Sequence, residues 1–119
     1  SAPLVVEGAG GLMVPLTDDY LTIDLFARWR QPVVLVARTG LGTINHSLLS
    51  IEALRARDIP IGGILFSGEA DEENERIIPH IAGVPSLGRL PWMETLDRAR
   101  LHLAMQAHVD LAALRALLA

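Results

Sequence analysis

The 119-residue sequence contains no lysine and no cysteine. All ten basic residues are arginines, so this chain cannot supply a Walker A loop, GxxxxGK[ST], in which a lysine contacts phosphates. The lack of cysteine excludes disulfides, thiolate nucleophiles and cysteine-ligated zinc, and it fits a reducing compartment such as the cytoplasm. No apolar run approaches the roughly 18 residues of a membrane-spanning helix. The formal net charge of −4 argues against nucleic acid or an anionic membrane as the main partner.

The apolar residues gather in four short runs that predict buried strands: residues 4–6, 33–37, 61–66 and 86–90. These runs are rich in β-branched and aliphatic residues, lack polar alternation and are separated by helical patterns. This arrangement is typical of a mostly parallel sheet with helices on both faces, so we expect an α/β fold. The length fits a single domain, and the 50% hydrophobic content is enough for a core.

Four helices are expected between and after these strands: residues 21–29, a segment from about Thr43, residues 72–82 and residues 96–118. Thr43 suits an N-cap of the second helix, and Gly83 suits a C-cap of the third. The second helix carries apolar residues along one face, namely Ile44, Leu48, Ile51 and Leu54. Because the sequence begins almost within the first predicted strand, we expect it to be part of a longer protein.

Ligands of parallel α/β sheets bind outside the carboxyl ends of the strands. This rule directs attention to residues 7–11, 38–45, 67–71 and 90–94, each of which follows or overlaps the end of a predicted strand. The acidic run at residues 69–75 is expected to be a solvated loop leading into a helix, with a metal site as the alternative.

Glu7 and the glycines at positions 8, 10 and 11 directly follow the first predicted strand. The glycines permit positive φ angles and a close approach of the backbone to a ligand. A dinucleotide fingerprint requires a helix next, but residues 13–16 read Met-Val-Pro-Leu, which excludes that motif. Two interpretations stay open. Glu7 could be a magnesium ligand beside bound phosphates, or the segment could be a tight turn in which Glu7 caps a neighbouring loop.

Residues 39–45 join the second predicted strand to its helix. Gly40 and Gly42 free the backbone, and a helix start near Thr43 points unsatisfied N–H groups towards the ligand edge of the sheet. Such a helix start binds carboxylates or phosphates. Asn45 stands where a third fingerprint glycine would be needed, so the alternative is a helix start whose glycines serve packing only.

Other catalytic patterns are missing. The four histidines form no HExxH motif, and neither Ser47 nor Ser67 lies in a GxSxG elbow. Trp92 follows the last predicted strand, where it could line a pocket or belong to the core.

Taken together, three motifs resemble the ATP-dependent dethiobiotin synthetase family: VVEGAGGLMVPL at residues 5–16, GTINH at residues 42–46 and LPW at residues 90–92. The resemblance covers residues 4–92 and only the C-terminal half of that family. It implies a P-loop NTPase-like fold whose first half, with the Walker A lysine, is missing, so that residues 1–119 form a single partial domain.

The resemblance also implies a reaction. In biotin biosynthesis, such a ligase uses ATP and Mg²⁺ to close the ureido ring of dethiobiotin from 7,8-diaminononanoate and CO2. It further implies a cytoplasmic homodimer. We expect the segment alone to be inactive, because phosphoryl transfer depends on the phosphate cradle and its lysine.

By position, the resemblance makes Glu7 the magnesium ligand and assigns no catalytic residue within this chain. It assigns two groups to substrate binding, the second at the neighbouring subunit's site: Gly8, Ala9, Gly10 and Gly11, and Leu41, Gly42, Thr43, Ile44 and Asn45. It places nucleotide binding at Ser67, Pro91, Trp92, Met93 and Glu94. Ser67 stands where the family often has an adenine-reading asparagine.

Two alternatives stay open at this point. One is a related amidoligase domain similar to cobyrinate amide synthases. The other is a non-catalytic regulatory or binding module of the same fold.

Overall fold

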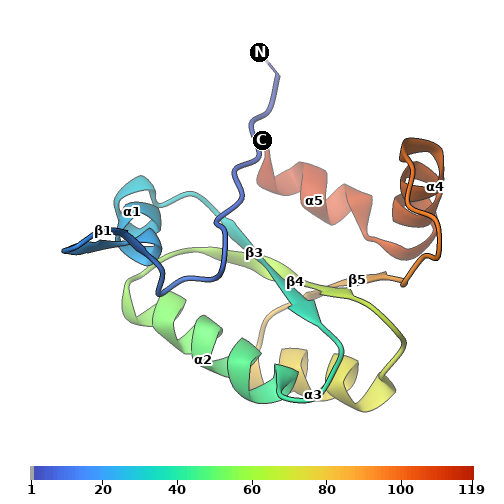
Figure 1. The fold of residues 1–119 in the computed structure, drawn as a ribbon, viewed down its shortest axis with the longest axis horizontal. Coiled ribbons are helices and arrows are strands. Elements are labelled where there is room, and N and C mark those ends of the chain that lie inside the picture. The colour runs from blue at the N-terminus through green and yellow to red at the C-terminus, as the bar shows by residue number, and fades with distance from the viewer. Residues whose placement is uncertain (1) are drawn as a thin grey trace.

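The computed structural model describes residues 2–119 and has an α/β fold (Figure 1). A small antiparallel pair, β1 (Pro15–Thr17) and β2 (Tyr20–Leu21), precedes a parallel sheet of order β3-β4-β5. The sheet strands are β3 (Val33–Arg38), β4 (Ile61–Ser67) and β5 (Ser86–Leu90). The helices are α1 (Thr22–Trp29), α2 (Thr43–Ala56), α3 (Glu72–Ala82), α4 (Arg98–His108) and α5 (Leu111–Leu117). The expected α/β class and parallel pairing are confirmed.

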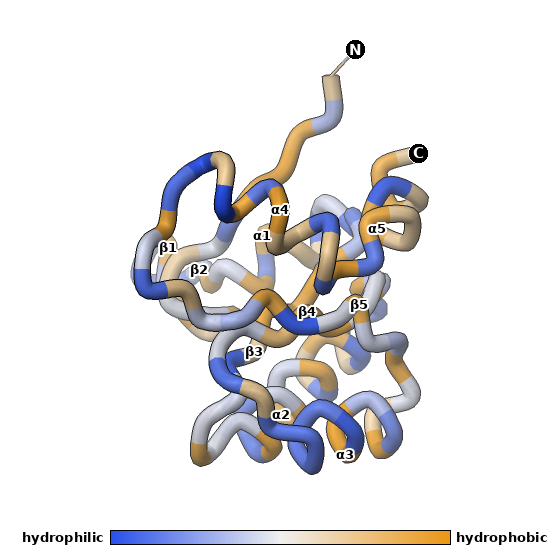
Figure 2. The backbone as a smooth tube through the Cα atoms, turned by 90° about the vertical axis from the view of Figure 1, so that its right-hand side faces the viewer, coloured by the Kyte–Doolittle hydropathy of each residue, from blue (hydrophilic) through white to orange (hydrophobic). Residues whose placement is uncertain are grey.

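The helices lie on both sides of the sheet. Figures 1 and 2 show α2 and α3 on one side of the strands and α4 and α5 on the other. The main core lies between the sheet and the α2–α3 layer. Its buried members come from the strands, from both helices and from the turn before β5: Ala37, Ile51, Ile64, Phe66, Ile78, Ala82 and Val84. Because parallel sheets bury apolar side chains, the short aliphatic runs in the sequence were sufficient to locate β3, β4 and β5.

A second cluster joins α1 to the far end of α2. Ile23, Leu54 and Ile59 are buried together, with Phe26 packed against them. The start of α1 is also tied to the preceding loop, because the Ile23 N–H donates to the Leu12 carbonyl (3.0 Å). These contacts fix the chain between the glycine segment and β3.

The predicted strand at residues 4–6 is wrong. The model assigns these residues no secondary structure, and the side chains of Leu4 and Val5 are 82% and 81% exposed. In Figure 2 the apolar stretch next to the N-terminus stands away from the strands. A strand is stabilised by hydrogen bonds to a neighbouring strand, and no strand in the described part of the chain pairs with this segment.

The single helix expected at residues 96–118 is two helices. Val109 is extended (φ −117°, ψ 140°) and forms an isolated antiparallel bridge with Gly88 of β5. The Asp110 N–H donates to the Leu87 carbonyl (2.9 Å), and the Asp110 side chain then caps α5 by accepting from the Ala113 N–H. The chain therefore leaves the helical conformation in order to dock on β5.

Two smaller features also differ from the sequence expectation. The N-cap of α2 is Gly42 (φ +92°), and Thr43 is the first helical residue. The hairpin of β1 and β2 was not predicted, although Asp18 and Asp19 form the kind of short polar link that joins such strands. None of the helices described for residues 2–119 has the length and apolar character to cross a membrane.

We predict that Gly88→Ala destabilises the protein by about 1–3 kcal/mol, because a residue with a Cβ is strained at the φ of +104° that Gly88 adopts. A Cβ at this position would also collide with the His108 carbonyl oxygen. Urea unfolding measures the change. Gly40→Ala is the matched control, because Gly40 has open space around its Cβ position and an ordinary φ. Equal unfolding midpoints for the two variants would contradict the docking of Val109 on β5.

Candidate functional site

The three parallel strands end side by side. In the strand register Arg38 pairs with Ser67, and Ser67 pairs with Leu90. The segments that start at Thr39, Gly68 and Pro91 therefore leave the sheet at the same edge. The Gly68 N–H donates to the Leu90 carbonyl (3.0 Å), which joins two of these segments directly. Three of the four segments expected at the ligand edge are thus brought together.

Asn74 links the first turn of α3 to the segment after β3. Its Nδ2 donates to the Thr39 carbonyl (2.9 Å) and to Asp71 Oδ2 (2.7 Å). Asp71 is the N-cap of α3 and accepts from the Asn74 N–H (3.1 Å). Sequence reasoning missed Asn74, because its partner Thr39 lies 35 residues away and no local pattern reports the contact.

Arg89 braces the other two strand ends. Its Nε lies 3.2 Å from Glu75 Oε1, and its Nη1 donates to the Gly68 carbonyl (3.0 Å). The second Glu75 oxygen accepts from the Asp71 N–H (2.9 Å). Both charged side chains are about three-quarters buried, with 23% and 24% exposure. The available signal was a charged residue, Arg89, inside the strand that reads SLGRL, since buried charges require partners.

The acidic residues at positions 69–75 therefore differ in their structural roles. Asp71 and Glu75 take part in the hydrogen bonds that hold the start of α3, whereas Glu73 forms an exposed pair with Arg76. No group of three or more potential metal ligands occurs among residues 2–119. A metal site built within the acidic run is not supported by the structure.

The segment between β3 and α2 presents backbone groups at the shared edge. The Thr43 N–H donates to the Gly40 carbonyl (3.2 Å), and the His46 N–H donates to the Gly42 carbonyl (3.0 Å). Within residues 2–119 the N–H groups of Ile44 and Asn45 have no acceptor, as expected for a helix start. The Thr43 hydroxyl points inward and lies 3.3 Å from the Ser47 hydroxyl, and both side chains are buried.

Leu41 and Arg38 mark the outer side of the same segment. The Leu41 side chain is 99% exposed, and its carbonyl accepts from Arg38 Nη2 (3.4 Å). Asn45 is also exposed, whereas Ile44 packs partly against the main core. The segment thus offers two free N–H groups, one guanidinium and one projecting apolar side chain.

The residues expected to contact a nucleotide lie at the ends of β4 and β5. Ser67 is half-buried, and Pro91 begins the segment beside it, because Ser67 and Leu90 are register partners. Trp92 is 65% exposed, so it is not a core residue. Met93 is half-buried and Glu94 is exposed. Gly68 has a φ of +128°, and a Cβ there would approach the Thr39 hydroxyl to 2.9 Å, which explains the glycine.

The segment from Glu7 to Gly11 lies beside α1 and forms no hydrogen bond with the loops at the strand ends within residues 2–119. Gly10 and Gly11 have φ angles of +84° and +119°, so the expected positive φ is confirmed at both. A Cβ at Gly8 would meet Phe26 and Thr22 of α1 at 3.1 and 3.2 Å. Glu7 and Ala9 are exposed. In the described part of the chain, no hydrogen bond joins this segment to the loops that follow β3, β4 and β5.

A family model described as an AAA domain matches residues 1–100. The chain belongs to the AAA domain family. It is similar to the ATP-dependent dethiobiotin synthetases of Brucella anthropi, with 58% identity, and Agrobacterium fabrum, with 57% identity, each over 110 residues. In both cases the match covers 92% of this chain and 52% of the relative. This AAA domain chain thus spans about half the length of those relatives, and the family resemblance expected from its motifs is confirmed.

We predict that Asn74→Ala lowers the free energy of unfolding by about 1–3 kcal/mol, because it leaves the Thr39 carbonyl and Asp71 without their donor. Amide exchange at Gly40 and Leu41 of the AAA domain should accelerate as well. Glu73→Ala is the matched control, since it removes only an exposed ion pair, whose contribution is small. Equal exchange rates in both variants would show that Asn74 does not hold the β3–α2 segment.

Proposed function

We propose that this chain is part of an ATP- and Mg²⁺-dependent ligase of biotin biosynthesis. The reaction would close the ureido ring of dethiobiotin from 7,8-diaminononanoate and CO2, with ADP and phosphate as the other products. A substrate amine takes up CO2 as a carbamate, ATP phosphorylates the carbamate, and the second amine attacks the mixed anhydride. The observation that carries the proposal is the 58% identity to a dethiobiotin synthetase across 92% of this chain.

The start of α2 supports the proposal as a binding site for the substrate carboxylate. The N–H groups of Ile44 and Asn45, which have no acceptor within residues 2–119, lie at the positive end of a 14-residue helix. Gly42 permits the tight approach, and the buried Thr43 and Ser47 hydroxyls keep the first turn rigid. A carboxylate bound here would orient the rest of the substrate relative to the strand ends.

The strand ends of β4 and β5 support a place for the nucleotide base. Ser67 offers a hydroxyl at the edge, and Pro91, Trp92, Met93 and Glu94, which directly follow β5, would form the adjacent wall. Arg89 holds the Gly68 carbonyl in place from the side, so the floor between these two strands is fixed before ligand binding. Pre-organised polar groups of this kind orient a ligand at little entropic cost.

Glu7 fits a magnesium role through the chemistry of its donor. Its carboxylate is exposed and engaged in no ion pair within residues 2–119, and glycines with positive φ follow it. Mg²⁺ is commonly held by one or two carboxylates together with substrate phosphates. When bound, the ion would neutralise charge on the phosphates, while Gly8 to Gly11 would let the backbone come close to the ligand.

Leu41 supports the proposed homodimer. An almost fully exposed leucine at a loop tip, with the 55% exposed Leu49 further along α2, is an unusual apolar surface for a solvated helix. We propose that this loop reaches the site of a neighbouring subunit, in a cytoplasmic enzyme. The chain alone would be inactive, because it contains no lysine to contact the transferred phosphate.

A chimera tests the proposed activity. The chain replaces its counterpart in the Brucella anthropi relative, and dethiobiotin formation is measured with ATP, CO2, Mg²⁺ and 7,8-diaminononanoate. We expect the chimera to turn over and the isolated chain to give no product. A chimera that folds, as judged by circular dichroism, but forms no dethiobiotin would contradict the proposed reaction.

Within this chimera we predict that Glu7→Gln lowers kcat/KM by roughly 10²-fold or more, because a neutral amide binds magnesium poorly. Glu52→Gln, on the exposed side of α2, is the matched control and should leave the rate unchanged. A magnesium titration separates the roles. Recovery of the Glu7→Gln rate at high Mg²⁺ supports ligation, whereas equal rates for both variants would rule it out.

A further inference from the structure

A continuous set of hydrogen bonds connects the ends of the three parallel strands. It runs through four side chains that form the polar network: Arg89, Glu75, Asp71 and Asn74. At one end Arg89 Nη1 donates to the Gly68 carbonyl (3.0 Å), and Arg89 Nε lies 3.2 Å from Glu75 Oε1. The second Glu75 oxygen accepts from the Asp71 N–H (2.9 Å), and Asp71 Oδ2 accepts from Asn74 Nδ2 (2.7 Å). At the other end Asn74 Nδ2 donates to the Thr39 carbonyl (2.9 Å).

The two ends of the polar network lie beside different proposed ligand segments. Gly68 directly follows Ser67, and its N–H donates to the Leu90 carbonyl, so its position affects both strand ends that are proposed to hold the nucleotide base. Thr39 begins the segment of residues 39–45, which is proposed to bind the substrate carboxylate. The glycines of that segment make its backbone intrinsically mobile, so an anchor at its start limits the conformations it can adopt. The network therefore holds one carbonyl beside each proposed ligand.

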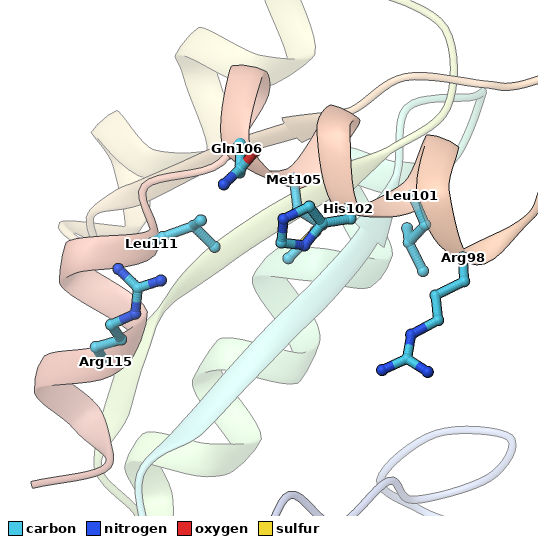
Figure 3. A pocket seen from close by; sticks show the side chains of 7 residues that line it. All are labelled: Arg98, Leu101, His102, Met105, Gln106, Leu111 and Arg115. Atoms are coloured by element: carbon cyan, nitrogen blue, oxygen red, sulfur yellow. The ribbon is translucent and has the colours of Figure 1, made fainter.

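The ion pair of Arg89 with Glu75 is largely buried, since the two side chains are 23% and 24% exposed. In contrast, Arg76 forms an exposed pair with a glutamate three residues away. Figure 3 shows Arg98 and Arg115 beside a hollow of about 350 Å³ between α4 and α5, and neither has a carboxylate partner within residues 2–119. Burial of an ion pair usually gains little stability, because both charges lose water. A buried pair at the ligand edge therefore calls for a reason other than stability.

We propose that the polar network contains two positioning residues of the reaction. Arg89 positions the strand ends that hold the nucleotide, and Asn74 positions the segment that holds the substrate carboxylate. Arg89 acts through the Gly68 carbonyl, and Asn74 acts through the Thr39 carbonyl. The two side chains between them join these ends by hydrogen bonds and keep them at a fixed separation. The inference rests on the proposed function and deepens it by naming residues that determine the affinity for each ligand.

Steady-state kinetics of the chimera with the Brucella anthropi relative tests the two roles separately. We expect Arg89→Met to raise KM for ATP at least about tenfold and to leave KM for 7,8-diaminononanoate within about twofold of its original value. Asn74→Ala should have the opposite pattern. In both variants kcat should change less than about threefold, because the loss of ground-state binding raises KM without lowering kcat. A purely structural role would lower the folded fraction, and so the apparent kcat, with both KM values unchanged. That result, or equal changes in both KM values, overturns the proposal.

Two further variants separate positioning from folding. Arg89→Met leaves the Glu75 carboxylate buried without its partner, which is costly. The double variant Arg89→Met and Glu75→Met removes both charges and should fold, as judged by circular dichroism, while KM for ATP stays raised because methionine cannot donate to the Gly68 carbonyl. A folded double variant with the original KM for ATP overturns the role of Arg89. Arg76→Met removes only an exposed ion pair and is the matched control, which should leave both KM values unchanged.

Equilibrium binding distinguishes the positioning roles from the proposed reaction. Calorimetric titration of the chimera with ATP and Mg²⁺, and separately with 7,8-diaminononanoate, measures both affinities without turnover. We expect Kd for ATP to rise at least about tenfold only in Arg89→Met, and Kd for 7,8-diaminononanoate to rise only in Asn74→Ala. A chimera that shows this pattern but forms no dethiobiotin contradicts the proposed reaction and supports the positioning roles. A chimera that turns over, with unchanged affinities in both variants, overturns the positioning roles and leaves the reaction intact.

Discussion

The pairing of β4 with both of its neighbours is the constraint on which the rest of the structure depends. β4 is parallel to β3 on one side and to β5 on the other, and Ile64 and Phe66 are fully inaccessible to solvent. Burial of two such side chains contributes about 1.5–3 kcal/mol each. The register of β4 with its neighbours also places Arg38, Ser67 and Leu90 side by side. It therefore determines which loops lie next to one another. Asn74 and Arg89 then tie those loops together by bonds to the Thr39 and Gly68 carbonyls.

The sequence was most informative where a local property decides the structure. Aliphatic runs located β3, β4 and β5 to within a residue or two, and the acidic start and Gly83 bounded α3. Glycine likewise predicted the positive φ angles at Gly10 and Gly11, because only glycine takes them without strain. In these cases the side chain itself, or its absence, carries the free energy that selects the conformation.

The failures share a different cause. Residues 4–6 are apolar enough for a strand. A strand forms only when a neighbouring strand pairs with it, and three residues do not show whether such a neighbour is present. The break between α4 and α5 depends on Val109 reaching Gly88 across the fold. Asn74 looked ordinary because its partner is distant in sequence, and Arg89 stood out only as a charge within a strand, with no indication of the residues that it contacts. Each of these features is a long-range contact, and local patterns cannot report it.

The positive charge at the candidate site is limited by the geometry of the strand ends. β3 ends at Arg38, whose guanidinium lies at the segment leading to α2. Of the two arginines at this edge, Arg89 is already engaged with Glu75, which leaves Arg38 alone to face an anionic ligand. A polyphosphate needs more positive charge than one exposed guanidinium supplies.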